Sequence, residues 1–131
     1  MKIKRFQGGY DNNFCYVLSC KETKTAAIID PSVEINPVIE YIDSNDLILD
    51  KILITHTHYD HIHYLNDFID LYPLIKVYAS SNAGFSGSVD FNKLGHNDII
   101  SLGKHLILLL FTPGHYFDSV CYWVKSKNIV F

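Results

Sequence analysis

Apolar and polar residues alternate in short stretches over the first third of the chain. Residues 2–6 alternate between polar and apolar with one interruption, while residues 14–18 and 26–29 are rich in β-branched and aromatic side chains. Alternation with a period of two is typical of strands, because successive strand side chains point to opposite faces. We therefore predict three strands here, and Asp30-Pro31 ends the third.

Two longer stretches have apolar residues at helical spacing. Asn36-Pro37 is typical of a helix start, because asparagine caps a first turn and proline fits the first helical position. We predict one helix from there to residues 44–45, and a second one that follows residue 61 and stops at Pro73. The apolar positions are Val38, Ile39 and Ile42 in the first helix, and Ile62, Leu65, Ile69 and Tyr72 in the second.

The remaining apolar runs predict more strands, and residues 80–95 show no clear pattern. The predicted strands are 51–55, 77–79, 106–111, 120–124 and 128–131, the last two forming a hairpin. Because the run 106–111 is apolar without interruption, we expect both of its faces to be covered. Strands interspersed with helices over 131 residues indicate one mixed α/β domain.

Composition narrows the classes of function. Hydrophobic residues make up 48% and charged residues 19% of the chain, with a net charge of −3, so disorder is not expected and no basic stretch indicates nucleic-acid binding. No apolar run is long enough to cross a membrane, and residues 1–6 do not lead into a signal peptide. Three cysteines without a C-x-x-C pair fit small core residues and a cytoplasmic location.

The chemistry is concentrated in residues 55–61, which read THTHYDH directly after a predicted strand. His56 and His58 are two residues apart, so in extended chain their side chains point the same way and can bind one metal ion. Asp60 and His61 lie where the chain turns into the next helix; they are expected to diverge from the first pair and to suit a second, adjacent ion. The alternative is a solvated polar loop with scattered histidines.

A second segment supports the first metal ion. His115 follows Thr112-Pro113-Gly114 at the end of another predicted strand, and it can supply the third nitrogen ligand beside His56 and His58. Imidazole and carboxylate groups are ligands for zinc, and also for iron or manganese.

With these motifs the sequence resembles the metallo-β-lactamase superfamily, most closely its hydroxyacylglutathione hydrolase (glyoxalase II-like) branch. The resemblance is carried by residues 27–31, 55–61 and 112–115 together with Ser119. It implies an αββα sandwich, of which the chain resembles the N-terminal half. The aspartate that bridges both metals in the family follows a strand resembling residues 128–131, and the family's last histidine ligand comes later still.

The resemblance also implies a division of the ligands. His56, His58 and His115 would hold a first zinc ion, and Asp60 and His61 a second one in the complete protein. The chain departs from the family at two places. His63 and Tyr64 stand where two glycines are common, while Tyr116 and the Asp118-Ser119 pair replace threonine and Gly-Ser; we expect these changes to alter the rim of the pocket.

We therefore expect a metal-dependent hydrolase. Metal-bound hydroxide would attack a small-molecule substrate, most simply a thioester of the hydroxyacylglutathione type, and Asp60 would be both ligand and orienting group. One alternative is a mononuclear iron sulfur-dioxygenase that uses His56, His58 and a later aspartate. Another, for these residues alone, is a non-catalytic metal-binding domain whose exposed sheet face would promote homodimers. The acidic balance argues against a nucleic-acid-processing member.

The roles of several neighbouring residues remain open. Asp30 could support the metal site from behind, or it could be an ordinary turn aspartate. Tyr59 and Tyr116 could line the pocket or pack on the surface. His63 could be a pocket residue, but we expect an exposed position on the helix, and we expect His96 and His105 to face solvent beside turns.

Overall fold

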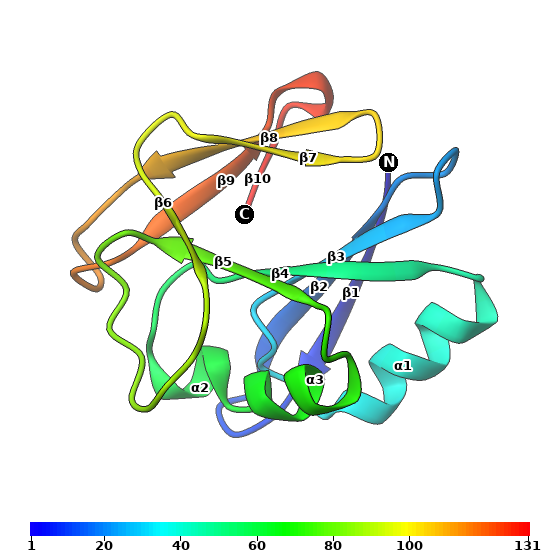
Figure 1. Ribbon diagram of the computed structural model, residues 1–131, viewed down its shortest axis with the longest axis horizontal. Coiled ribbons are helices and arrows are strands. Elements are labelled where there is room, and N and C mark those ends of the chain that lie inside the picture. Colours follow the sequence, from blue (N-terminus) through cyan, green and yellow to red (C-terminus); the bar gives the residue numbers. More distant parts are fainter.

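Two β-sheets pack face to face, and helices cover the outer face of the larger one (Figure 1). The computed structural model describes residues 1–131. The larger sheet contains β1 (Lys2–Gly8), β2 (Asn13–Ser19), β3 (Thr25–Ile29), β4 (Ile48–Leu53), β5 (Lys76–Ser80) and β6 (Asn92–Leu94). The smaller sheet contains β7 (Ile99–Leu102), β8 (His105–Phe111), β9 (Val120–Val124) and β10 (Ile129–Val130). The helices are α1 (Ile35–Ser44), α2 (Tyr59–Ile62), α3 (Leu65–Leu71) and the 3-10 turn η1 (Lys125–Lys127).

The direction of the strands determines where the loops meet. The larger sheet has the order β1-β2-β3-β4-β5-β6, antiparallel as far as β3 and parallel from β3 to β6. The smaller sheet has the order β10-β9-β8-β7 and is antiparallel throughout. Because parallel strands end at the same edge of a sheet, Asp30 after β3 and residues 54–58 after β4 lie together there.

Two hydrophobic cores follow from the alternation along β3, which is buried on both faces. Ala26 and Ile28 pack toward α1 and α3, in one core with Phe68. Ala27 and Ile29 pack between the two sheets, in a second core that includes Tyr122 and eleven other buried residues. The larger sheet therefore lies in the middle of the molecule and fixes the positions of both outer layers.

Both predicted helices differ in detail from the structure. α1 begins at Ile35, one residue before the predicted cap Asn36, so Pro37 still lies in the first turn, where no amide hydrogen is needed. The second predicted helix is divided into α2 and α3, because the amide of Tyr64 donates to the carbonyl of Pro31, at 3.1 Å, instead of to a partner one turn earlier. In the unassigned region 80–95, the structure shows only the short strand β6.

The prediction that both faces of the strand 106–111 are covered is wrong. Leu106 is 59% exposed, because no element of residues 1–131 covers the outer face of the smaller sheet. Ile99, Leu108, Trp123 and Val130 are paired across neighbouring strands on that face. The helical layer expected there is therefore not within this chain, which shows the αββ part of the sandwich.

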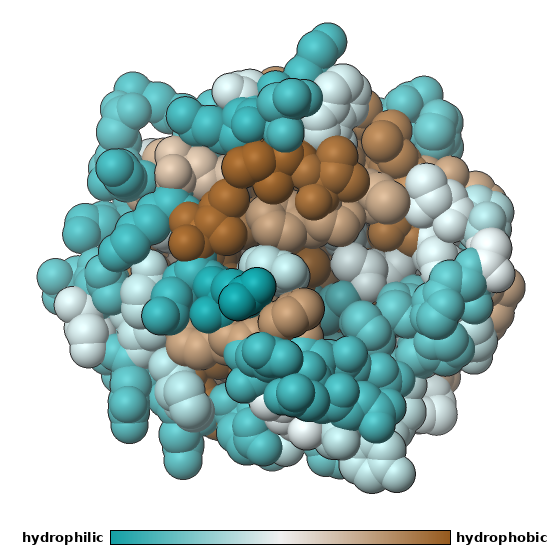
Figure 2. All heavy atoms as spheres, turned by 180° about the vertical axis from the view of Figure 1, so that it is seen from behind, coloured by the Kyte–Doolittle hydropathy of each residue, from teal (hydrophilic) through white to brown (hydrophobic).

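Hydrophobic side chains also gather on the back of the molecule, at the level of the smaller sheet (Figure 2). From the sequence we expect homodimers to form through an exposed apolar sheet face, and such a face is present. Self-association itself stays a prediction. None of the helices has the length and apolar character that crossing a membrane requires.

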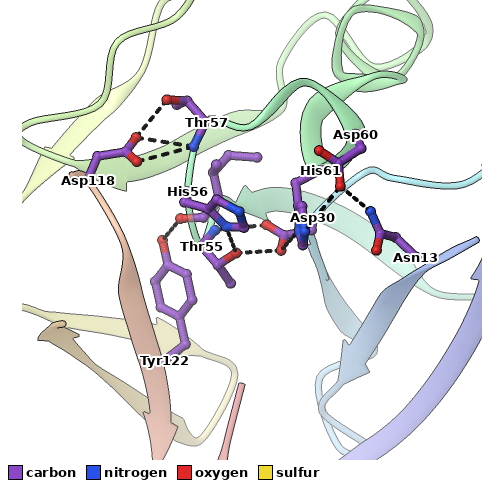
Figure 3. Close-up of polar contacts among 10 residues, drawn as sticks. Asn13, Asp30, Thr55, His56, Thr57, Asp60, His61, Asp118 and Tyr122 are labelled. Atoms are coloured by element: carbon purple, nitrogen blue, oxygen red, sulfur yellow. Dashed lines mark hydrogen bonds and ion pairs between the residues drawn. The ribbon is translucent and has the colours of Figure 1, made fainter. Parts of the chain in front are cut away.

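Tyr122 joins the two sheets through a buried hydrogen bond. Its side chain is fully buried, and Oη donates to the carbonyl of Ile54, at 2.9 Å, just after β4 (Figure 3). The bond links the smaller sheet to the segment that leads into the histidine motif.

We expect Tyr122→Phe to lower the free energy of unfolding by about 1–2 kcal/mol, because the Ile54 carbonyl would lose this buried donor. Denaturant titration measures the change. Tyr10→Phe is the matched control, since Tyr10 is 75% exposed and should give wild-type stability. Equal stability of both variants would show that the bond contributes nothing.

Candidate metal centre

Three histidines from two different loops face one another. His56 and His58 follow β4, and His115 lies between β8 and β9. Their ring centroids form a near-equilateral triangle, 4.8 Å between His56 and His58, 5.0 Å between His56 and His115, and 4.9 Å between His58 and His115. One ligand atom of each lies within 4.8 Å of the others. The structure thus brings together all three residues that the sequence assigned to a first metal ion.

The ring of His56 is held in one orientation by a chain of hydrogen bonds. Thr55 Oγ1 donates to the Asp30 carboxylate at 2.6 Å, so it accepts from Nδ1 of His56 at 3.0 Å (Figure 3). Nε2 then carries the free lone pair, and this atom is buried without a hydrogen-bond partner. Burial and the neighbouring histidines lower the pKa of His56 to about 4, so the ring stays neutral. A neutral, buried, unpartnered imidazole nitrogen fits a metal ligand.

Asp60 and His61 form a second pair of candidate metal ligands. Nδ1 of His61 lies 2.9 Å from Asp30 Oδ2, and because a carboxylate only accepts, Nδ1 donates, so Nε2 keeps its lone pair in the neutral ring. That Nε2 lies 3.6 Å from Oδ2 of Asp60 (Figure 3). The ring of His61 lies 4.1 Å from that of His56, so the second group of candidate ligands lies directly beside the first, and its assignment to a second, adjacent ion stays a prediction.

Opposing effects act on the titration of the second pair. Burial alone would lower the pKa of His61, but the hydrogen bond and charge of Asp30, together with the charge of Asp60, raise it overall. Burial would raise the pKa of Asp60, but hydrogen bonds, above all from Asn13, and the nearby histidines lower it. Asp60 is therefore held as a carboxylate, the form that binds a metal ion.

The structure decides between the two roles considered for Asp30. The residue is buried, adopts a left-handed backbone conformation with φ of 49°, and accepts from the amide of Thr55 at 2.8 Å. Its carboxylate therefore connects the ends of β3 and β4 and orients both His56 and His61. Asp30 is a support of the site and not an ordinary turn aspartate.

Two residues of the site were missed or misplaced by the sequence reasoning. Asn13, at the start of β2, donates to Asp60 Oδ2, and nothing in its spacing indicates a contact with a residue 47 positions away. Asp118 was expected to alter the pocket rim, but it is only 1% exposed and accepts hydrogen bonds from Thr57. The departure from the family's glycine at this position was the signal that could have indicated a special role.

The other aromatic neighbours divide into two groups. Tyr116 lies beside the ligands, with its ring 3.9 Å from that of His58. Tyr59 is 61% exposed and packs on His63, away from the three-histidine triangle. The prediction that His63 is exposed is wrong, because its ring lies between Tyr59 and Tyr64 and its Nδ1 is buried.

The remaining histidines lie outside the triangle. His96 is exposed, as predicted, whereas His105 is partly buried.

A cavity of about 690 Å³ opens beside the metal-ligand candidates, between the edges of the two sheets. Its polar end is formed by Asp30, His56, His61 and His115. The apolar wall consists of Ile3, Phe14, Tyr16, Ile29, Val120, Ile129, Val130 and Phe131. A small molecule that enters this space can therefore reach the imidazole groups while it contacts apolar side chains.

Comparisons with known proteins agree with this geometry. The family model described as "Metallo-beta-lactamase superfamily" matches residues 8–131, and the chain belongs to this superfamily. A curated relative is the "Probable hydroxyacylglutathione hydrolase glo2" of Schizosaccharomyces pombe, 39% identical over 123 residues that cover 92% of this chain and 46% of that protein. Another is the "Probable polyketide biosynthesis zinc-dependent hydrolase BaeB" of Bacillus velezensis, 31% identical, covering 88% of this chain and 52% of that protein.

Solved structures show the same fold. ETHE1 from Myxococcus xanthus superposes with a TM-score of 0.81 at 26% identity, covering 95% of this chain and 54% of that one. The chain thus spans about half the length of the curated relatives it matches, in line with the resemblance to half of the fold.

Replacing Asp30 by asparagine tests how His61 is oriented. In Asp30→Asn, the amide oxygen can still accept from Thr55 N, but the amide nitrogen would face His61 Nδ1 and donate to it. We expect the proton of His61 to move to Nε2, which removes the lone pair beside Asp60. Long-range ¹H–¹⁵N NMR of the imidazole nitrogens detects this change of tautomer.

The control for this experiment is Asp98→Asn, because Asp98 is exposed and its carboxylate accepts only from the amide of Gly95. It should leave the His61 signals unchanged. If Asp30→Asn also left them unchanged, Asp30 would not determine the tautomer.

Proposed function

We propose that the chain carries the metal centre of a hydrolase that acts on small-molecule thioesters of the hydroxyacylglutathione type. The observation that carries the proposal is the buried Nε2 of His56, without a hydrogen-bond partner and surrounded by His58 and His115. Leaving such a nitrogen unpaired in the interior costs free energy, and a metal ion bound by the three histidines would provide the missing partner.

The donor types favour zinc as the metal. Three imidazole nitrogens leave a fourth position open, which is typical of catalytic zinc sites. The similarity to a protein named a zinc-dependent hydrolase supports the same choice, although iron and manganese use related donors. When bound, the ion would lower the pKa of a coordinated water to about 7 and so supply the nucleophile for hydrolysis.

The side chains of this protein would prepare that reaction. Asp30 and Thr55 make Nε2 the free nitrogen of the neutral His56 ring, and in the neutral ring of His61 the bond to Asp30 likewise leaves Nε2 as the free nitrogen. Asn13 holds the carboxylate of Asp60 beside His61, where the two would bind a second ion and Asp60 would help to orient the nucleophile. The cavity, with its apolar wall, gives a small acyl compound access to this end of the sheets.

The thioester substrate is supported by the relatives. The glo2 protein of Schizosaccharomyces pombe, 39% identical to this chain, is named a probable hydroxyacylglutathione hydrolase. Because the chain spans about half the length of that relative, metal binding and hydrolysis are best tested as separate properties.

His58→Ala should raise the Kd for zinc by more than about 100-fold, since even residues behind metal ligands commonly contribute 10–100-fold. Hydrolysis of a 2-hydroxyacyl-glutathione thioester, measured by the release of free thiol, should be lost in parallel. Equilibrium dialysis with elemental analysis measures the bound metal. His96→Ala is the control, because His96 is an exposed histidine outside the site.

Two results would contradict the proposal. Full zinc binding by His58→Ala would show that the triangle is not the metal site. Iron in place of zinc in the purified wild-type protein, with no thioester hydrolysis, would favour the iron-dependent dioxygenase alternative.

A further inference from the structure

The carboxylate of Asp118 contacts the peptide segment between two of the candidate ligands. Asp118 lies three residues after His115, in the loop between β8 and β9, and is 1% exposed. Its Oδ2 accepts from Thr57 Oγ1 at 2.8 Å and from the Thr57 amide at 3.2 Å, and Oδ1 lies 3.3 Å from the same amide. Figure 3 shows these contacts on the side of Thr57 away from Asp30 and His61.

These contacts join two parts of the metal centre that come from different layers. His56 and His58 belong to the loop after β4 in the larger sheet, whereas His115 belongs to a loop of the smaller sheet. The backbone hydrogen bond between these loops, from the amide of Val120 to the carbonyl of Thr55 at 2.9 Å, reaches only the residue before His56. Asp118 provides the side chain that hydrogen-bonds to Thr57, the residue between His56 and His58.

The chemistry of a buried carboxylate makes this contact restrictive. Asp118 takes part in no ion pair. Its buried carboxylate is therefore stabilised by the hydrogen bonds that Thr57 donates. A buried carboxylate without a cation loses much of its stabilisation when such donors move away. The loop that carries His115 is therefore held at a fixed distance from Thr57.

We propose that Asp118 is a positioning residue that, through Thr57, holds His115 in register with His56 and His58 and so sets the metal affinity of the three-histidine site. The inference rests on the proposed function, because it requires that site to bind a metal ion. It concerns a residue that departs from the glycine common in the superfamily, so it describes how this chain builds the site.

The test replaces Asp118 by glycine, the residue that the superfamily commonly has at this place. The backbone should accept the change, while all acceptors for Thr57 are lost. We expect the Kd for zinc, measured by competition with a chromophoric chelator, to rise about 10–100-fold, the range typical of groups that orient metal ligands. The visible spectrum of the cobalt-substituted protein should also change, because it reports the arrangement of the three nitrogens around the ion.

A second variant acts on the other partner. Thr57→Val removes the hydroxyl donor and keeps the amide, so its Kd should rise by a smaller factor. Combined with Asp118→Gly it should add little, because both changes remove the same contact. Asp98→Gly is the matched control, since Asp98 is an exposed turn carboxylate and its loss should leave zinc binding unchanged.

Each outcome decides between a positioning role and a purely structural one. Thermal unfolding of the metal-free proteins is measured alongside. If Asp118→Gly lowers the melting temperature but binds zinc and cobalt as the wild type does, the inference is overturned while the proposed function stands. If the wild type itself binds neither metal, the proposed function fails and the inference with it. If Asp118→Gly does not fold, Thr57→Val decides, and an unchanged Kd would overturn the inference.

Discussion

The buried carboxylate of Asp30 must receive its hydrogen bonds from within the protein, and the groups that supply them lead directly to the metal centre. Thr55 donates through both its amide and its hydroxyl, and His61 donates through Nδ1. These bonds tie the ends of two parallel strands together. The same bonds fix which nitrogen of His56 and of His61 is free, so the fold and the chemistry depend on one side chain.

The second sheet is brought to this edge by different means. Its core packs against β3 and β4, and Tyr122 donates to the carbonyl that precedes the histidine motif. Asp118 then contacts the motif itself. The ligand triangle is thus built from one rigid edge and one attached loop, so its geometry depends on buried polar contacts across the two layers.

The sequence reasoning succeeded where the signal was local. His56 and His58 were paired because they lie two residues apart after an apolar strand, and His115 was added because it follows another apolar strand and can supply the third nitrogen ligand. It failed where long-range contacts decide. The division between α2 and α3 follows from a bond between Tyr64 and Pro31, and Asn13 meets Asp60 across 47 positions, so no periodicity could show either. The metal and the division of the ligands between two ions stay predictions.

The outer face of the smaller sheet has an optical consequence. Trp123 is the only tryptophan of the chain, and it is partly buried on that face, beside Leu108 and Val130 and beneath the amine of Lys125. Its neighbour in the strand, Tyr122, points the opposite way, into the core between the sheets, and donates to the carbonyl that precedes the histidine motif. Intrinsic fluorescence therefore reports whatever approaches the outer face of the smaller sheet. This signal is separate from the chemistry at the histidines.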